Sequence, residues 1–337
     1  MKKNNLVVDD RPLFFLFTCV KEGRPFVDKL FDSLLSQTKI NFVHYIYEDG
    51  PNDSIGDLVE SYKKKVEELQ TPYQVIYEYN PVNIGLTSAT QHCIEMCNSK
   101  YFIWIDCDNW VDKDFFKELE KEVLKHDDTR IIRTRCISSS GISLNGEGFT
   151  FRNRFKKNQL KYFLYNSFCY GFFAVDFEWF KQINPSLYFL KKRDYFIDDQ
   201  VIFTAMLHNG KFAFSDSAIG IYLEHDSNES ILFRAKNPQG EYDNYSETAH
   251  FFGDKLELPL KHFYSIRVTF ENMSRMAIMN NKEAWRLYFE RIKDFKKNKI
   301  PHNLRYKFGG NSFAWFVRLL FSKILYVLRK GKKQSGK

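Results

Sequence analysis

The sequence predicts an α/β protein built around a mostly parallel sheet. Short apolar runs rich in aromatic and β-branched residues alternate with segments that repeat apolar residues at helical spacing. The apolar runs are residues 13–20, 41–47, 73–79 and 101–105. Strand and helix alternate up to Asp106, which is typical of a parallel sheet with helices packed on both faces.

The segments between the runs each carry an apolar helical face. The first follows Pro25, and the second follows Asp53 or Ser54, either of which is a good N-cap. The third is the segment LTSATQHCIEMC, residues 86–97. Two further apolar runs, residues 168–176 and 212–225, predict strands, and helical patterns follow the second.

Composition narrows the class of protein. The 337 residues, 44% of them apolar, are enough for one large or two modest domains with a sizeable core. Although the net charge is +8, acids and bases are mixed along most of the chain, and the clearest basic run is a tail at residues 329–337, so we expect no nucleic-acid partner. Six scattered cysteines without a C-x-x-C pair suggest neither a zinc site nor a disulfide framework, and they fit a reducing, cytoplasmic compartment.

Polar residues follow each of the four apolar runs, where the carboxyl ends of parallel strands bind ligands. A single loop such as 48–54 is explained better by turn and N-cap chemistry than by a site. Four such loops at one sheet edge favour a site. The candidate residues are Thr18, Glu48, Asp49, Gly50, the loop 80–85, Asp106 and Asp108.

Asp106 and Asp108 end a buried run, where two like charges repel and lose solvation unless a cation compensates them. On extended backbone the two carboxylates point to the same side, and Cys107 points the other way, into the core. Such a pair suits Mg²⁺ or Mn²⁺, which accept substrate phosphate oxygens as further ligands. A glycosidase pair fits less well, because those acids normally come from different strands and lie about 5 Å or more apart.

Four segments, in this order, resemble the family 2 glycosyltransferases of the GT-A fold. They are FTCVKEGRPFVDKLFDSLLSQT, HYIYEDGPNDS, NIGLTSATQHCIE and YFIWIDCDNWVDKDFF. The resemblance covers residues 13–225 and implies transfer of a sugar from a nucleotide diphosphate donor, with inversion at the anomeric carbon. In that family Thr18, Asn83 and Gly85 would contact the nucleotide, and Asp49 would bind the base of a uridine-type donor.

The resemblance also implies a metal centre. Asp106 would contact the ribose or donor as well as the metal, Asp108 would coordinate Mn²⁺ or Mg²⁺, and His225 would be a third metal or phosphate contact. The chain departs from the family pattern at two positions. Glu48 replaces the first Asp of the usual pair, and Thr90 stands where many members have a donor-contacting Arg.

Inversion needs a base that takes the proton of the attacking hydroxyl. The segment 193–207 has helical spacing and two acids in its first turn, which the helix macrodipole alone would explain. In the family, however, Asp199 falls on the second residue of the acceptor motif, so the resemblance makes Asp199 the base and Asp198 its neighbour.

The sequence divides into an N-terminal extension at 1–12, a catalytic domain at 13–225, a helical region at 226–310 and an amphipathic basic helix with a tail at 311–337. That last helix either lies on an anionic membrane or packs on the protein itself, and its polybasic end favours the membrane. No stretch of about 18 uncharged apolar residues occurs, so we expect no transmembrane helix and a peripheral place on the inner face of the cell membrane.

The expected reaction moves one sugar of the Glc, Gal, GlcNAc or GalNAc type from UDP to a hydroxyl of a surface-glycan or lipid-linked acceptor. Single addition is expected because the Q-x-x-R-W motif of processive synthases is absent. The alternative is a membrane-associated nucleotide-binding scaffold on a degenerate transferase fold, which Thr90 and the basic tail motivate. A nucleotidyltransferase fits less well, since KEGRP is a poor phosphate loop.

Overall fold

The computed structural model describes residues 11–38, 41–52, 54–69, 73–125, 129–141, 171–183 and 211–225. The chain divides into two compact units, Met1–Gln159 with Asn166–Glu224, and Leu160–Tyr165 with His225–Lys337. All the described residues except His225 belong to the first unit. The regions expected at 226–310 and 311–337, residues 1–10 of the N-terminal extension, Asp198 and Asp199 lie outside the described residues.

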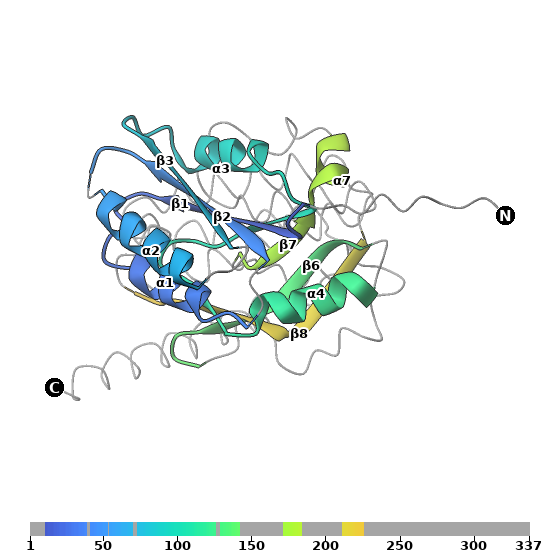
Figure 1. Ribbon diagram of the computed structural model, residues 1–337. Coiled ribbons are helices and arrows are strands. Elements are labelled where there is room, and N and C mark those ends of the chain that lie inside the picture. Colours follow the sequence, from blue (N-terminus) through green and yellow to red (C-terminus); the bar gives the residue numbers. More distant parts are fainter. Residues whose placement is uncertain are drawn as a thin grey trace, which may run out of the picture. The chain divides into compact units, whose positions relative to one another are not determined.

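One eight-stranded sheet organises the first unit (Figure 1), with strand order β3-β2-β1-β4-β7-β6-β8-β5. Its strands are β1 Phe14–Val20, β2 Phe42–Asp49, β3 Gln74–Asn80, β4 Tyr101–Trp104, β5 Trp110–Val111, β6 Thr129–Ser138, β7 Phe173–Asp176 and β8 Lys211–Tyr222. The four predicted apolar runs form β1 to β4, which are neighbours and mutually parallel. The predicted mostly parallel α/β architecture is therefore confirmed.

The remaining strands continue the sheet beyond β4. Strand β7 runs antiparallel to both β4 and β6, so β6 points the same way as β4. Strand β8 is parallel to β6, and the short β5 is antiparallel to β8. The carboxyl ends of β1, β2, β3, β4, β6 and β8 therefore share one edge.

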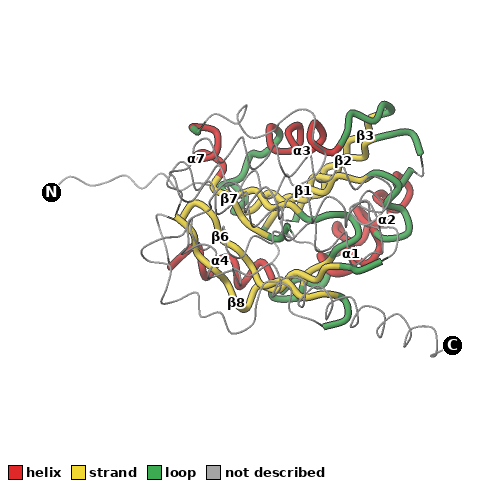
Figure 2. Tube along the Cα trace, turned by 180° about the vertical axis from the view of Figure 1, so that it is seen from behind, coloured by secondary structure: helices red, strands yellow, loops and turns green. Residues whose placement is uncertain are grey.

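Helices cover both faces of the sheet (Figures 1 and 2), and their bounds are α1 Val27–Leu35, α2 Gly56–Glu68, α3 Leu86–Glu95, α4 Phe115–Lys125 and α7 Phe177–Gln182. Helices α1, α2 and α4 lie on one face, where Phe31 stacks on Tyr62 and Phe116 stacks on Phe42. Helices α3 and α7 lie on the other, where His92 contacts Tyr45 and Phe180 meets Phe102 edge-on. No helix in the described part of the chain is both long and apolar enough to span a membrane.

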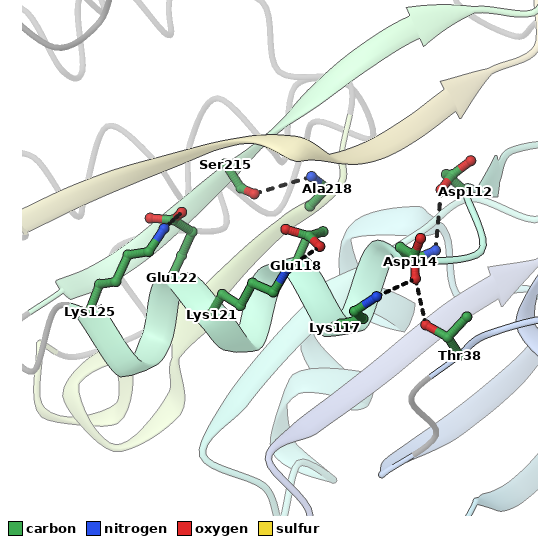
Figure 3. A network of polar contacts seen from close by, with 10 residues as sticks. All are labelled: Thr38, Asp112, Asp114, Lys117, Glu118, Lys121, Glu122, Lys125, Ser215 and Ala218. Carbon is green, nitrogen blue, oxygen red and sulfur yellow. Dashed lines mark hydrogen bonds and ion pairs between the residues drawn. The ribbon is translucent and has the colours of Figure 1, made fainter.

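Helix α4 carries a ladder of ion pairs on its surface (Figure 3). Lys121 pairs with Glu118 at 2.6 Å and Lys125 with Glu122 at 2.7 Å, each one helical turn apart. At the start of the helix Asp114 accepts a hydrogen bond from the Thr38 hydroxyl at 2.6 Å, which ties α4 to the residues after α1. Ion pairs at the surface each add little stability, so this ladder contributes little to the free energy of folding.

A buried polar chain runs beneath the carboxyl edge. His44 of β2 is fully buried, with Nε2 3.1 Å from the Thr18 hydroxyl and Nδ1 3.2 Å from the Tyr62 hydroxyl. Burial lowers the pKa of His44 from 6.5 to about 3, because the apolar surroundings disfavour the charged ring. The imidazole is therefore neutral at physiological pH, and both of its nitrogens are paired.

His44 should make the protein less stable in mild acid. Because its pKa is lowered in the folded state, the unfolded chain binds more protons below pH 6.5, and the contribution that is complete above this pH is lost as the pH falls toward 3. Between pH 7.5 and pH 5 the loss is about 2 kcal/mol. Urea unfolding at both pH values should show this difference in the wild type and a smaller one in His44→Gln, which does not titrate. Equal losses in the two proteins would assign the acid sensitivity to other groups.

Candidate active site

The predicted site residues of the first unit that the structure describes, Thr18, Asp49, Asn83, Gly85, Asp106 and Asp108, lie at or just beyond the carboxyl ends of β1 to β4. Strand β1 pairs in register with β2, which places Val20 opposite Glu48, and with β4, which places Phe17 opposite Trp104. Thr18, Asp49 and the residues that follow β3 and β4 are consequently brought to the ends of four adjacent parallel strands. His225 is also described, three residues beyond the end of β8, but it belongs to the second unit.

Asp49 closes the loop that follows β3. The carboxylate is 4% exposed, and its two oxygens accept hydrogen bonds from the backbone N–H groups of Ile84 at 2.9 Å and Gly85 at 3.0 Å. The Gly85 N–H also donates to Asn83 Oδ1 at 2.9 Å, and Gly85 has a φ of +84°, in the left-handed region that favours glycine. Asp49, Asn83 and Gly85 therefore form one unit that shapes the entry to α3.

Glu48, next to Asp49, points toward α2 and has a different role. It is 2% exposed, and its Oε2 accepts hydrogen bonds from the Tyr77 hydroxyl and from the Ile55 N–H at 3.3 Å, just before α2 begins. Burial, together with the hydrogen bond to Glu48, raises the pKa of Tyr77. Oε1 of Glu48 is buried without a hydrogen-bond partner among the described residues. Glu48 thus anchors the start of α2 to the sheet, which accounts for an acid at this position.

Thr18 and Thr90 both lie inside the structure. Thr18 is 1% exposed and its hydroxyl is bound to His44, so its expected contact with the nucleotide stays a prediction. Thr90 of α3 is fully buried, with its hydroxyl oxygen 3.9 Å from Cys19 Sγ, and Cys19 Sγ lies 3.6 Å from Cys93 Sγ. Where many family members place an arginine, this chain therefore has a buried, uncharged side chain.

The turn after β4 carries Asp106 and Asp108, both half-buried. Cys107 between them packs against the hydrophobic core, as expected. Burial raises the pKa of its thiol, and the carboxylates of Asp108 and Asp106 add to the rise. Residues 106–109 form a turn rather than the extended backbone that was expected, because the Asn109 N–H donates to the Asp106 carbonyl oxygen at 3.0 Å, and the two half-buried carboxylates lie on this turn with a half-buried thiol between them.

Gly23, in the loop after β1, lets that loop approach the turn. A Cβ placed on Gly23 would lie 2.8 Å from Cys107 Sγ and 2.7 Å from Val20 Cγ1, closer than real Cβ atoms come. On the other side of the turn, the Lys29 ammonium of α1 lies 3.5 Å from the centre of the Trp110 ring, which is a close cation–π contact. The sequence did not reveal the roles of Gly23 and Lys29, because each of these contacts joins segments that are far apart in the chain.

The aspartate pair fits part of a metal site. Among the described residues no group of three or more His, Cys, Asp or Glu side chains is arranged to hold a metal ion by itself. Asp106 and Asp108 offer hard oxygen donors, which suit Mg²⁺ or Mn²⁺ when phosphate oxygens complete the coordination. The donor set therefore fits a cation that binds together with a diphosphate.

Comparison with known proteins shows the family to which the chain belongs. Residues 16–183 match the model of the family described as glycosyl transferase family 2. The chain belongs to this family. The uncharacterized glycosyltransferase EpsJ of Bacillus subtilis is 28% identical over 111 residues, which are 33% of this chain and 30% of EpsJ. The glycosyltransferase GlyA of Streptococcus pneumoniae is 22% identical over 121 residues, which are 36% of this chain and 16% of GlyA.

This family 2 chain also resembles solved structures. The crystal structure of S. aureus TarS residues 1–349 in complex with UDP-GlcNAc aligns with a TM-score of 0.61 at 14% identity, over 87% of this chain and 83% of that one. The likeness shows that the two share a fold, and the expected GT-A fold is confirmed. The chain spans less than a third of the length of the curated relatives it matches, at most 30%.

Replacing Gly23 tests whether the close packing around it requires a residue without a side chain. Gly23→Ala forces Val20 and Cys107 apart and should cost about 1–3 kcal/mol of unfolding free energy, measured by urea denaturation. Gly56→Ala is the matched control: its Cβ would lie 3.5 Å from the Tyr77 hydroxyl, an ordinary contact, at the first residue of α2. The control should be neutral or slightly stabilising. Equal effects of the two changes would show that Gly23 tolerates a side chain.

Proposed function

We propose that this chain transfers a single sugar of the Glc, Gal, GlcNAc or GalNAc type from UDP to a hydroxyl of a surface-glycan or lipid-linked acceptor, with inversion. The observation that carries the proposal is that two features lie at the same carboxyl edge of the sheet, at the end of β2 and after β4. These are the loop held by Asp49 and the turn with Asp106 and Asp108, which flank β1. Further support comes from family membership and from TarS, whose related fold was solved with UDP-GlcNAc.

Asp49 is the proposed base-binding residue. Its two oxygens already accept backbone N–H groups, but a carboxylate offers about four acceptor positions, so an imide N–H of uracil can be added. The hydrogen bonds that hold the 83–85 loop also fix the direction of the carboxylate before the nucleotide arrives. Asn83, Gly85 and Thr18 would border the ribose and nucleotide.

Asp108 and Asp106 are the proposed ligands of Mn²⁺ or Mg²⁺, and His225 is the proposed third contact to metal or phosphate. When bound, the cation would neutralise charge on the departing diphosphate. The turn itself would orient the diphosphate, because Gly23 lets the loop after β1 pack closely against it and Trp110 contacts Lys29 of α1.

Asp199 is the proposed base, and Asp198 its neighbour. As the acceptor hydroxyl attacks the anomeric carbon, its proton passes to the Asp199 carboxylate and the bond between the sugar and the diphosphate oxygen breaks. Attack from the face opposite the diphosphate inverts the anomeric centre. The second candidate function, a nucleotide-binding scaffold without turnover, is favoured by the buried Thr90, which supplies no cation to the diphosphate.

Two substitutions separate donor binding from chemistry, and each serves as the control of the other. Asp108→Ala should weaken Mn²⁺-dependent binding of UDP and lower transfer, as EDTA should in the wild type, because a carboxylate ligand is lost. Asp199→Asn should keep donor binding and reduce transfer by about 100-fold or more, because general base catalysis contributes roughly that much. Binding is measured by calorimetry and transfer by release of UDP from a panel of UDP-sugars with candidate acceptors.

Three results would contradict parts of this scheme. Full activity of Asp108→Ala, or of the wild type in EDTA, would remove the metal role. Loss of UDP binding in Asp199→Asn would move Asp199 out of the role of base. Nucleotide binding without turnover across the whole panel would favour the scaffold.

The proposal places the chain on the inner face of the cell membrane through residues 311–337, where an acceptor carried on a lipid would be within reach. Flotation with vesicles that contain anionic lipid should recover the full chain. It should recover much less of a chain that ends at residue 310, or of one with Arg329→Gln, Lys330→Gln, Lys332→Gln and Lys333→Gln, because each basic residue contributes about 1 kcal/mol of attraction. Equal flotation of all three proteins would refute the membrane contact.

A further inference from the structure

Asn109 lies directly after the two aspartates and is 1% exposed. Its backbone N–H donates to the Asp106 carbonyl oxygen at 3.0 Å, and its side-chain Nδ2 donates to Asp106 Oδ2 at 3.2 Å. Its Oδ1 accepts a hydrogen bond from the Leu223 N–H at 3.0 Å. Both ends of the buried amide are therefore used, one on the aspartate and one on the backbone just beyond β8.

The chemistry of the partners fixes which way the amide points. The Leu223 N–H can only donate, so the atom that faces it must be the amide oxygen, and a carboxylate can only accept, so the NH₂ group must face Asp106. Aspartate at this position would set two carboxylates against each other, and an apolar residue would leave buried polar groups unpaired. The geometry therefore demands a short side chain that both donates and accepts.

The backbone on either side of Leu223 is itself hydrogen-bonded to Ser139, which follows β6. The Ser139 N–H donates to the Tyr222 carbonyl oxygen at 2.8 Å, and the Glu224 N–H lies 3.4 Å from the Ser139 hydroxyl. The exits of β6 and β8 are thereby joined, and Asn109 connects them to the turn after β4. Asp106 is thus oriented from a distant part of the same edge, because β7 and β6 lie between β4 and β8 in the strand order.

We propose that Asn109 is a positioning residue for the proposed reaction. It aims the Asp106 carboxylate at the cation and diphosphate, and it keeps the exit of β8 beside the turn. This inference rests on the proposed function, in which Asp106 serves a metal bound together with the diphosphate. Residues that orient a metal-binding side chain through a hydrogen bond commonly change metal affinity by about 10–100-fold when they are replaced.

The test compares Asn109→Asp with Gln37→Glu in the full chain. Gln37 is a matched buried amide, 5% exposed, whose Nε2 donates to the Ser33 and Asp112 carbonyl oxygens at 3.0 and 2.7 Å and whose Oε1 accepts from the Phe116 N–H at 3.3 Å. Calorimetry measures Mn²⁺ affinity in the presence of UDP, and UDP affinity in EDTA. Asn109→Asp should weaken Mn²⁺ binding by about 10–100-fold and leave UDP affinity in EDTA unchanged. Gln37→Glu should lower the melting temperature and leave both affinities unchanged.

If Asn109→Asp fails to fold, Asn109→Ser provides the same comparison, since serine retains a small polar group but cannot reach both partners. Unchanged Mn²⁺ affinity in a folded variant would overturn the role of Asn109 and leave the proposed function intact. An equal loss of UDP affinity with Mn²⁺ and in EDTA would show a general structural role and would also overturn it. Absence of Mn²⁺-dependent UDP binding in the wild type would overturn the proposed function and this inference together.

Discussion

The parallel pairing of β1 with both β2 and β4 is the constraint on which the site depends. β1 lies between these two strands, and helices pack on both faces of the sheet, so most of its seven residues are buried. Polar side chains must then either lie where the strands end or be hydrogen-bonded inside the protein, as the Thr18 hydroxyl is to His44. Because the three strands run in the same direction, their polar ends meet, and loops that are distant in the sequence form one edge.

A second requirement is electrostatic. Two carboxylates at the end of a buried strand repel each other and would pull the turn toward solvent unless it were held. Two contacts hold the residues next to it, Lys29 of α1 on Trp110 and the Leu223 N–H on Asn109, and the absence of a side chain at Gly23 lets the loop after β1 pack closely against Cys107. Charges that are held in place in the free protein need little reorganisation when a cation binds.

The sequence was sufficient to predict β1 to β4, because each is a compact apolar run. Their predicted limits differ from the observed ones by at most two residues. It predicted β8 at 212–225, where the strand occupies Lys211–Tyr222. It missed β6, in which Arg130, Arg133 and Arg135 interrupt the apolar pattern. Gly23 and Asn109 could not be inferred either, since a glycine that avoids a clash and an asparagine that joins two strands leave no local pattern.

The pleat of the strands, rather than residue type, decides which acid at the edge can serve a ligand. Successive side chains of a strand point to opposite faces. Glu48 and Thr18 point toward α2, where they bind the Ile55 N–H and His44, whereas Asp49 and Cys19 point toward α3, where they meet Gly85 and Thr90. Two adjacent acids at the end of β2 therefore cannot share one ligand: the first stabilises the start of α2, and the second shapes the loop at residues 83–85. After β4 the alternation stops, because residues 106–109 form a turn that is closed by the hydrogen bond from the Asn109 N–H to the Asp106 carbonyl oxygen, and Cys107 packs on the core between the two aspartates.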